Sequence, residues 1–222
     1  MSAAAAPEFV GIIAQLPPGS SLRMDDVSWD DYEDLLADLG ESYSVRVFYD
    51  QGRMEIMSPA SMHERPKNVI NRLLTTLSDE LDVDLESLGS TTYKEEWKAK
   101  GAEPDDSFYI QNASAVMGKD ENLDLAHDPP PDLVIEVDHS SSSLNRFPIY
   151  AGLGVPELWR VYHRRLRIWL LEGGDYVESA HSRAFPFLTA DVISDFLEKG
   201  IAGSSRKVAQ EFRQWLRQHR QP

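Results

Sequence analysis

Residues 130–161, PPDLVIEVDHSSSSLNRFPIYAGLGVPELWRV, contain the segment that decides the fold. Prolines introduce a short apolar run from Leu133 to Val137, whose β-branched residues predict a strand. A serine-rich turn leads into a short helix at roughly 144–153, and ELWRVYH then predicts another strand. A strand, a helix and a further strand in close succession indicate the α/β class.

The pattern of strands and helices extends outward from this segment. Upstream, YSVRVFY and RMEIMS predict two strands joined by a turn at 50–52. Apolar residues at spacings of three and four predict a helix over 66–81, and Pro66 suits its first turn. Further strands are predicted near 90–97, over 103–110, at ELWRVYH and at LRIWLL, and further helices near 189–199 and over 205–219. We therefore expect a central mixed sheet, mostly antiparallel, flanked by helices.

The chain length and one proline-rich stretch suggest the domain organisation. A chain of 222 residues favours a single domain with short additions at its ends. The Pro-Pro-Gly-Ser-Ser stretch at 17–21 separates the N-terminal segment from the rest. We expect an N-terminal segment over 1–27, an α/β domain over 28–200 and a C-terminal helix within 201–222.

Composition excludes several classes of protein. The chain has no cysteine, which excludes thiolate metal sites and cysteine nucleophiles and fits a reducing compartment. No apolar run reaches about 18 residues, so no membrane-spanning helix is expected. The N-terminus lacks a basic leader of the kind that signal peptides carry. These features predict a cytoplasmic protein.

The net charge of −15 is unevenly distributed along the chain. Residues 144–222 carry 12 basic and 8 acidic side chains, so the acidic excess lies entirely in 1–143. Contacts with phosphates need local lysine and arginine, so such a chain is a poor general binder of nucleic acid. A role on nucleic acid would depend on bound metal and on a local basic patch. The candidates for phosphate contacts are Arg160, Arg164, Arg165 and Arg167.

The acidic residues of PDLVIEVD gather on one side of the predicted strand. Side chains alternate between the faces of a strand, so Asp132, Val134, Glu136 and Asp138 share one face, and Leu133, Ile135 and Val137 take the other. An unpaired carboxylate inside an apolar strand costs several kcal/mol. Either an arginine of the C-terminal third or a divalent cation should therefore neutralise Glu136.

A second acidic pair lies in EPDDSFYI. By alternation, Asp105 shares a face with Ser107 and Tyr109, and Asp106 lies on the other face. One of these aspartates should point toward Glu136 if the two strands are neighbours. Two hard oxygen donors from adjacent strands suit Mg²⁺, which keeps several waters and needs few protein ligands.

Other catalytic motifs are missing from the sequence. None of the six histidines forms an H-E-x-x-H pair, so a zinc hydrolase is not expected. The serines after the predicted strand lack a G-x-S-x-G elbow, and neither a P-loop nor a G-x-G-x-x-G stretch is present. The acidic pair is therefore the main candidate for chemistry.

Four stretches together resemble a known family. YDQGRMEIMSP, HERPKNVINRLL, EPDDSFYI and the segment 130–161 follow one another as in the Uma-two family of restriction endonucleases. The resemblance covers roughly residues 28–200. It implies the restriction-endonuclease-like fold of the PD-(D/E)xK nuclease superfamily.

The resemblance also implies roles for individual residues. Pro104 and Asp105 match the "PD" element, and Glu136 matches the acidic residue of the D/E-x-K element. The lysine of that element is replaced by Asp138, and the position to which this family is thought to have moved it carries Arg146. Asp105 and Glu136 are thus the expected metal ligands, with Mg²⁺ or Mn²⁺ as the cofactor, and Arg146 is the expected third catalytic residue.

Two functions are consistent with these residues. The first is a metal-dependent endonuclease that hydrolyses phosphodiester bonds of DNA, acting as a homodimer so that both strands can be cut. The second is a catalytically impaired nuclease-fold protein that binds nucleic acid or another protein. The charge of −15 and Arg146 favour the second, whereas the retained Asp105 and Glu136 favour the first.

Overall fold

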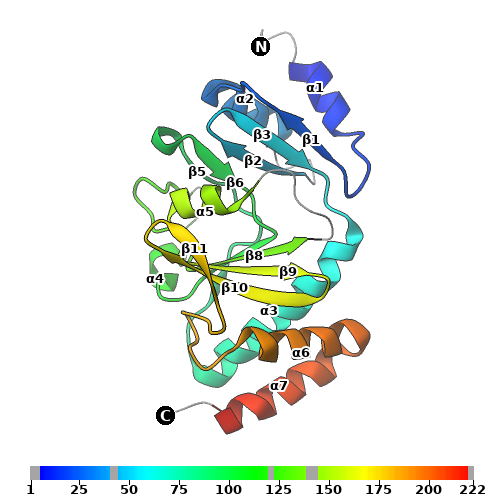
Figure 1. The fold of residues 1–222 in the computed structure, drawn as a ribbon, viewed down its shortest axis with the longest axis vertical. Helices are drawn as coiled ribbons and strands as arrows, with labels where there is room; N and C mark the ends of the chain where they lie inside the picture. The colour runs from blue at the N-terminus through cyan, green and yellow to red at the C-terminus, as the bar shows by residue number, and fades with distance from the viewer. Residues whose placement is uncertain (1–5, 41–44, 120–122, 139–144, 220–222) are drawn as a thin grey trace.

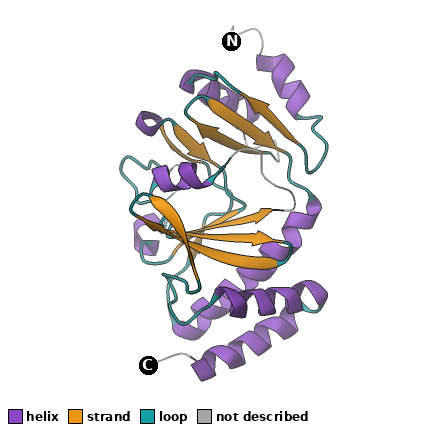
Figure 2. Cartoon of the chain, viewed as in Figure 1, coloured by secondary structure: helices purple, strands orange, loops and turns teal. Residues whose placement is uncertain are grey.

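Two β-sheets and the helices around them make up residues 6–40, 45–119, 123–138 and 145–219, which the computed structural model describes (Figures 1 and 2). The strands are β1 (Ser21–Met24), β2 (Arg46–Asp50), β3 (Arg53–Met57), β4 (Glu86–Ser87), β5 (Tyr93–Glu95), β6 (Lys100–Ala102), β7 (Asp106–Tyr109), β8 (Leu133–Asp138), β9 (Glu157–Tyr162), β10 (Arg165–Glu172) and β11 (Asp175–Ser179). The helices are α1 (Ala6–Ile13), α2 (Trp29–Leu39), α3 (Ser61–Leu81), α4 (Ala113–Val116), α5 (Phe147–Leu153), α6 (Ala190–Ala202) and α7 (Ser205–His219), with a 3₁₀ turn at Glu96–Lys98.

The first sheet has five strands in the order β1-β3-β2-β6-β5, and each pair of neighbouring strands in it is antiparallel. The N-terminal segment contributes β1, whose Ser21 lies opposite Met57 of β3. Helix α2 begins with Ser28 as its N-cap, and its buried Tyr32 and Leu35 pack on this sheet with Ile56. The stretch before residue 28 is therefore joined to the sheet through backbone pairing.

The second sheet has six strands in the order β11-β10-β9-β8-β7-β4. Strands β8 and β9 are parallel and every other neighbouring pair is antiparallel, so the predicted mixed, mostly antiparallel sheet flanked by helices is confirmed. The strands are nevertheless divided between two sheets, where the sequence suggested one. Alternation identifies a strand but not its partner, which explains the difference.

Helices cover the six-stranded sheet on both faces. On one face lie α3, α6 and α7, whose buried Leu73, Leu77 and Phe212 pack with Ile135 and Trp159. The short helix α5 covers part of the other face and packs there in a separate core. This core includes Ile149, Tyr150 and Leu153 of α5 and Val134 and Leu158 of the sheet. The α5 face is the one that carries the acidic residues.

Helix α3 differs from its predicted bounds. It begins at Ser61, five residues before the predicted start, and Pro66 lies inside it. Proline lacks the N–H that would bond the carbonyl four residues earlier, but the rest of the helix continues through this position. Pro66 was therefore wrong as a start signal.

None of the described helices is long and apolar enough to cross a membrane.

Candidate active site

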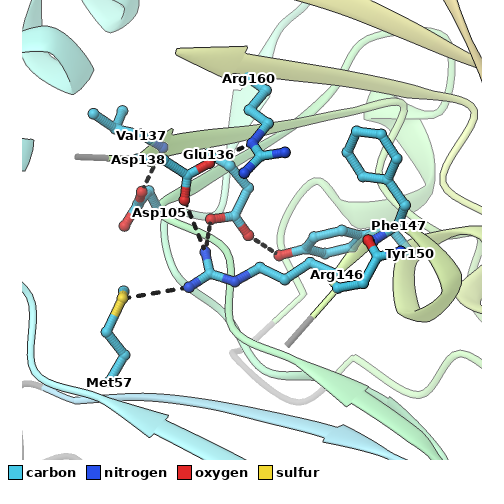
Figure 3. A network of polar contacts seen from close by, with 10 residues as sticks. Met57, Asp105, Glu136, Val137, Asp138, Arg146, Phe147, Tyr150 and Arg160 are labelled. Atoms are coloured by element: carbon cyan, nitrogen blue, oxygen red, sulfur yellow. Dashed lines mark hydrogen bonds and ion pairs between the residues drawn. The ribbon is translucent and has the colours of Figure 1, made fainter. Parts of the chain in front are cut away.

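Asp105 and Glu136 lie opposite each other at the junction of β7 and β8. Asp106 pairs with Ile135, so the antiparallel register places the preceding residue, Asp105, opposite Glu136. Directly opposite residues of an antiparallel pair present their side chains on the same face. The N–H of Val137 donates a hydrogen bond of 2.7 Å to Oδ2 of Asp105 and fixes that carboxylate at the end of the strand (Figure 3).

Helix α5 holds the Glu136 carboxylate from the other side. Arg146, the N-cap residue of α5, donates from Nη1 to Oε2 of Glu136, and the Tyr150 hydroxyl donates to Oε1 (Figure 3). Residues four apart lie on one face of a helix, so both donors reach the same group. All three side chains are buried.

Arg146 also connects the two sheets. Its guanidinium lies over the ring of Phe48 of β2, 3.9 Å from the ring centroid, and Nη2 donates to Sδ of Met57 of β3 at 3.3 Å. Its Nη1 lies 4.0 Å from Oδ1 of Asp138. Among the described residues, its buried Nε has no hydrogen-bond partner. The guanidinium is thus fixed between an aromatic ring and two carboxylates.

Asp138 belongs to the same polar cluster. Its Oδ2 accepts from Nε of the partly exposed Arg160 on the neighbouring strand β9 (Figure 3). We call Asp105, Glu136, Asp138 and Arg146 the acidic cluster. With Arg160 included, its three carboxylates face two guanidinium groups. When all five groups are ionised, one negative charge remains uncompensated within it.

The electrostatics of the acidic cluster depend on burial. Burial raises the pKa of Glu136 to about 8; Arg146 and the Tyr150 hydroxyl oppose the shift, and the charges of Asp105 and Asp138 reinforce it. Burial disfavours the charged form of Arg146 as well, but Glu136, Tyr150, Asp138 and Asp105 together outweigh this effect and raise the pKa of Arg146. The guanidinium therefore stays charged, and Glu136 is the group whose ionisation a further cation would promote.

The oxygen atoms of Asp105 and Glu136 fit a divalent cation. Within the described residues, Oδ1 of Asp105 has no hydrogen bond, and each oxygen of Glu136 receives a single donor although it can accept more. Mg²⁺ keeps several waters and binds through one or two carboxylates. Across the described ranges, no group of three or more His, Asp or Glu side chains is placed to hold a metal ion, so these two carboxylates would have to bind it with water. Two carboxylates with an uncompensated charge suit a metal that is open to water.

The structure also shows what the sequence left open. Arg146 points into the acidic cluster and pairs with Glu136. Buried Glu157 lies outside that cluster and accepts from Trp159 Nε1 at 2.6 Å and from the N–H groups of Arg183 and Ala184. The contact of Tyr150 with Glu136 was not predicted. The four-residue spacing of arginine and tyrosine at the start of α5 was the available signal.

Comparisons with known proteins bear on the family and the fold of the chain. The family described as "Putative restriction endonuclease", Uma2, matches residues 29–201, which is most of the chain. The crystal structure of a protein from Anabaena variabilis, titled as a putative nuclease belonging to DUF820, superimposes with a TM-score of 0.52. It is 13% identical in sequence, and the match covers 77% of this chain and 99% of that one. No curated protein matches the chain. From the extent of the family match we conclude that the chain belongs to the Uma2 family and has the restriction-endonuclease-like fold.

Proposed function

We propose that the chain is a metal-dependent endonuclease that hydrolyses phosphodiester bonds of DNA, with Mg²⁺ or Mn²⁺ as its cofactor. One observation carries the proposal: Asp105 and Glu136 lie opposite each other on one face of the sheet, inside a cluster with an excess of carboxylates. Membership of a nuclease family supports it. Homodimerisation, which would let both strands be cut, belongs to the same proposal.

Asp105 and Glu136 would hold the cation. A bound divalent cation lowers the pKa of a coordinated water and neutralises charge on a phosphate. Within the chain, the Val137 N–H orients Asp105 and the Tyr150 hydroxyl orients Glu136. These contacts preorganise the two carboxylates, so that little rearrangement is needed when the metal and the substrate arrive.

Arg146 would stabilise charge without moving protons. Its pKa is raised further above the usual arginine value, so it cannot act as a base near neutral pH. Its Nη2 donates to the thioether of Met57, which is a weak acceptor. A phosphate oxygen is a far better acceptor for a guanidinium, so this N–H can be redirected to a substrate.

A second candidate function rests on the same contacts. Arg146 and Tyr150 each engage one oxygen of Glu136, which is also how a purely structural buried ion pair would be satisfied. Combined with a net charge of −15, this favours a nuclease-fold protein that binds a partner without cleaving DNA.

A cleavage assay separates the two functions. Supercoiled plasmid and labelled oligonucleotides are incubated with Mg²⁺ or Mn²⁺ and with wild type, Asp105→Asn, Glu136→Gln or the control Glu157→Gln. Glu157 is equally buried but is held outside the acidic cluster. Metal-dependent cleavage by wild type and the control, lost in the other two folded variants, supports the endonuclease. Absence of cleavage by all four proteins, or cleavage at the same rate by all four, would support the non-catalytic function.

A further inference from the structure

The hairpin of β9 and β10 carries a concentration of positive charge beside the acidic cluster. Its sequence over 160–167 is RVYHRRLR, with four arginines and no acidic residue in a chain of net charge −15. Tyr162 pairs with Arg165, so the two strands are joined by the two-residue turn His163–Arg164. We call Arg160, Tyr162, Arg164, Arg165 and Arg167 the arginine hairpin.

The strand register connects this hairpin to the acidic cluster. Two rows cross the sheet from β8 through β9 to β10: Glu136, Arg160 and Arg167 form the first, and Asp138, Tyr162 and Arg165 form the second. Residues paired across strands share a face of the sheet. Neighbouring strands are about 4.8 Å apart, so Arg160 begins roughly 5 Å from the acidic residues, and Arg165 and Arg167 begin roughly 10 Å from them.

The outer arginines are accessible and only weakly paired. Arg165 and Arg167 are each 64% exposed. Their partners, Asp195 at 3.9 Å and Glu178 at 3.6 Å, are exposed as well. Exposed ion pairs contribute about 0–1 kcal/mol, so both arginines can exchange these partners for phosphate oxygens.

The turn of the hairpin has a backbone that its residues do not favour. His163 and Arg164 have φ values of 49° and 63°, in the left-handed region that glycine or asparagine adopts more easily. The next hairpin makes its two-residue turn with Gly173 and Gly174, at φ values of 61° and 96°. In the turn between β9 and β10, the chain thus has Arg164 at a position where glycine would relieve the backbone strain. Such strain is typical of functional positions.

Tyr162 adds a stacking surface to the cations. Its side chain is 44% exposed at the end of β9, and the ring of His163 meets it edge-on with centroids 4.1 Å apart. Aromatic side chains beside a basic groove bind single-stranded nucleic acid because every base offers a flat face.

From the register, the exposure and the turn, we propose that the arginine hairpin binds the phosphates of one DNA strand next to the cleaved phosphate, with Tyr162 stacking on a base. The inference rests on the proposed endonuclease function and adds a substrate preference to it. The protein should bind DNA that is single-stranded at the site more tightly than continuous duplex.

Binding in the presence of EDTA tests this inference separately from cleavage. Fluorescence anisotropy is measured with labelled single-stranded and duplex oligonucleotides over a range of salt concentrations. The double variant Arg165→Ala/Arg167→Ala should raise the Kd for the single strand at least about tenfold. The slope of log K against log salt should fall by about 1.4, since each single-strand phosphate contact contributes about 0.7. The matched control Arg206→Ala/Lys207→Ala removes two exposed charges from α7, which packs against the opposite face, and should leave Kd and slope unchanged.

A second variant separates binding from folding. His163→Asn/Arg164→Gly supplies the residues that this turn favours, so it should raise the melting temperature, by about 2–4 °C if the relief is near 1 kcal/mol. The same variant should weaken single-strand binding, because Arg164 is lost. Tyr162→Ala should reduce the preference for the single strand over duplex.

The outcomes for the hairpin and for the active site are distinguishable. If wild type cleaves DNA but the hairpin variants bind like the α7 control, the inference about the hairpin is overturned and the endonuclease stands. If wild type binds single strands through the hairpin but never cleaves, the endonuclease fails and the binding surface is supported. Failure of wild type to bind, or a duplex preference independent of Tyr162, overturns the inference as stated.

Discussion

Arg146 and Tyr150, four residues apart at the start of α5, donate hydrogen bonds to opposite oxygens of the Glu136 carboxylate. One turn of helix therefore sets the orientation of the residue at the centre of the acidic cluster. The arginine supplies charge and the tyrosine supplies a neutral donor, so replacing each should affect the site differently.

Tyr150→Phe should destabilise the protein by about 1–3 kcal/mol, because a buried carboxylate oxygen loses its donor. The hydroxyl helps to hold down the pKa of Glu136, so its loss should move the acidic limb of the cleavage pH profile upward. Chemical denaturation and a pH–rate profile measure the two effects. Tyr176→Phe is the control, since its partly buried hydroxyl donates to the Val155 carbonyl outside the cluster. Equal pH profiles for the two variants would remove Tyr150 from the site.

Arg146→Lys should be at least as active as wild type, and Arg146→Ala should be less active than either. Lysine keeps the charge but can take part in proton transfer, which arginine cannot. Plasmid cleavage at matched protein concentrations gives the order of activities. Identical rates for all three proteins would contradict a catalytic role for Arg146.

The stability of these variants forms a separate prediction. At about pH 9, above the pKa of Glu136, Arg146→Met leaves this buried carboxylate without its cationic partner and should lower the free energy of unfolding by about 3–5 kcal/mol. Adding Glu136→Gln to this variant should restore much of that loss. Denaturant unfolding of both single variants and the double variant measures the coupling. A strictly additive result would show that the pair contributes nothing beyond its separate parts.

Metal-free protein should lose stability as the pH rises toward 8. The pKa of Glu136 is about 8 in the folded protein against 4.5 for an ordinary glutamate. The folded state therefore holds a proton that the unfolded state has released. The stability from this shift is complete below about pH 4.5 and is lost as the pH rises through about 8.

Urea unfolding between pH 5 and 8 in a chelating buffer checks this expectation. The slope attributable to Glu136 is at most about 1.4 kcal/mol per pH unit. Glu136→Gln lacks the titrating group and should show a flatter profile, while other buried carboxyls such as Asp106 contribute equally to both proteins. Parallel profiles for wild type and Glu136→Gln would mean that Glu136 is ionised throughout this range.

The elements with a clear apolar pattern could be predicted from the sequence. Residues 133–138 alternate as expected, with Ile135 and Val137 in the core on one face and Glu136 on the other. Strands β1 and β6 have only four and three residues, too few to show alternation, and neither was predicted. The division into two sheets depends on pairing between distant segments, which local patterns do not encode.

Only part of the candidate site could be predicted from the sequence. Its acidic residues follow from alternation and from the family resemblance. The surroundings of Arg146 do not, because Phe48 and Met57 come from the other sheet, about 90–100 residues earlier in the chain. No spacing rule connects residues that meet only through tertiary packing.

The central claim is that Asp105 and Glu136 bind a divalent cation, and Mn²⁺ binding followed by electron paramagnetic resonance tests it most directly. Wild type and Glu157→Gln should each bind Mn²⁺ at this site, and Mg²⁺ should displace it. Asp105→Asn and Glu136→Gln should bind more weakly by at least about tenfold, with unchanged folding by circular dichroism. Equal Mn²⁺ affinity in all four proteins would contradict the account and leave the acidic cluster as a structural ion-pair network.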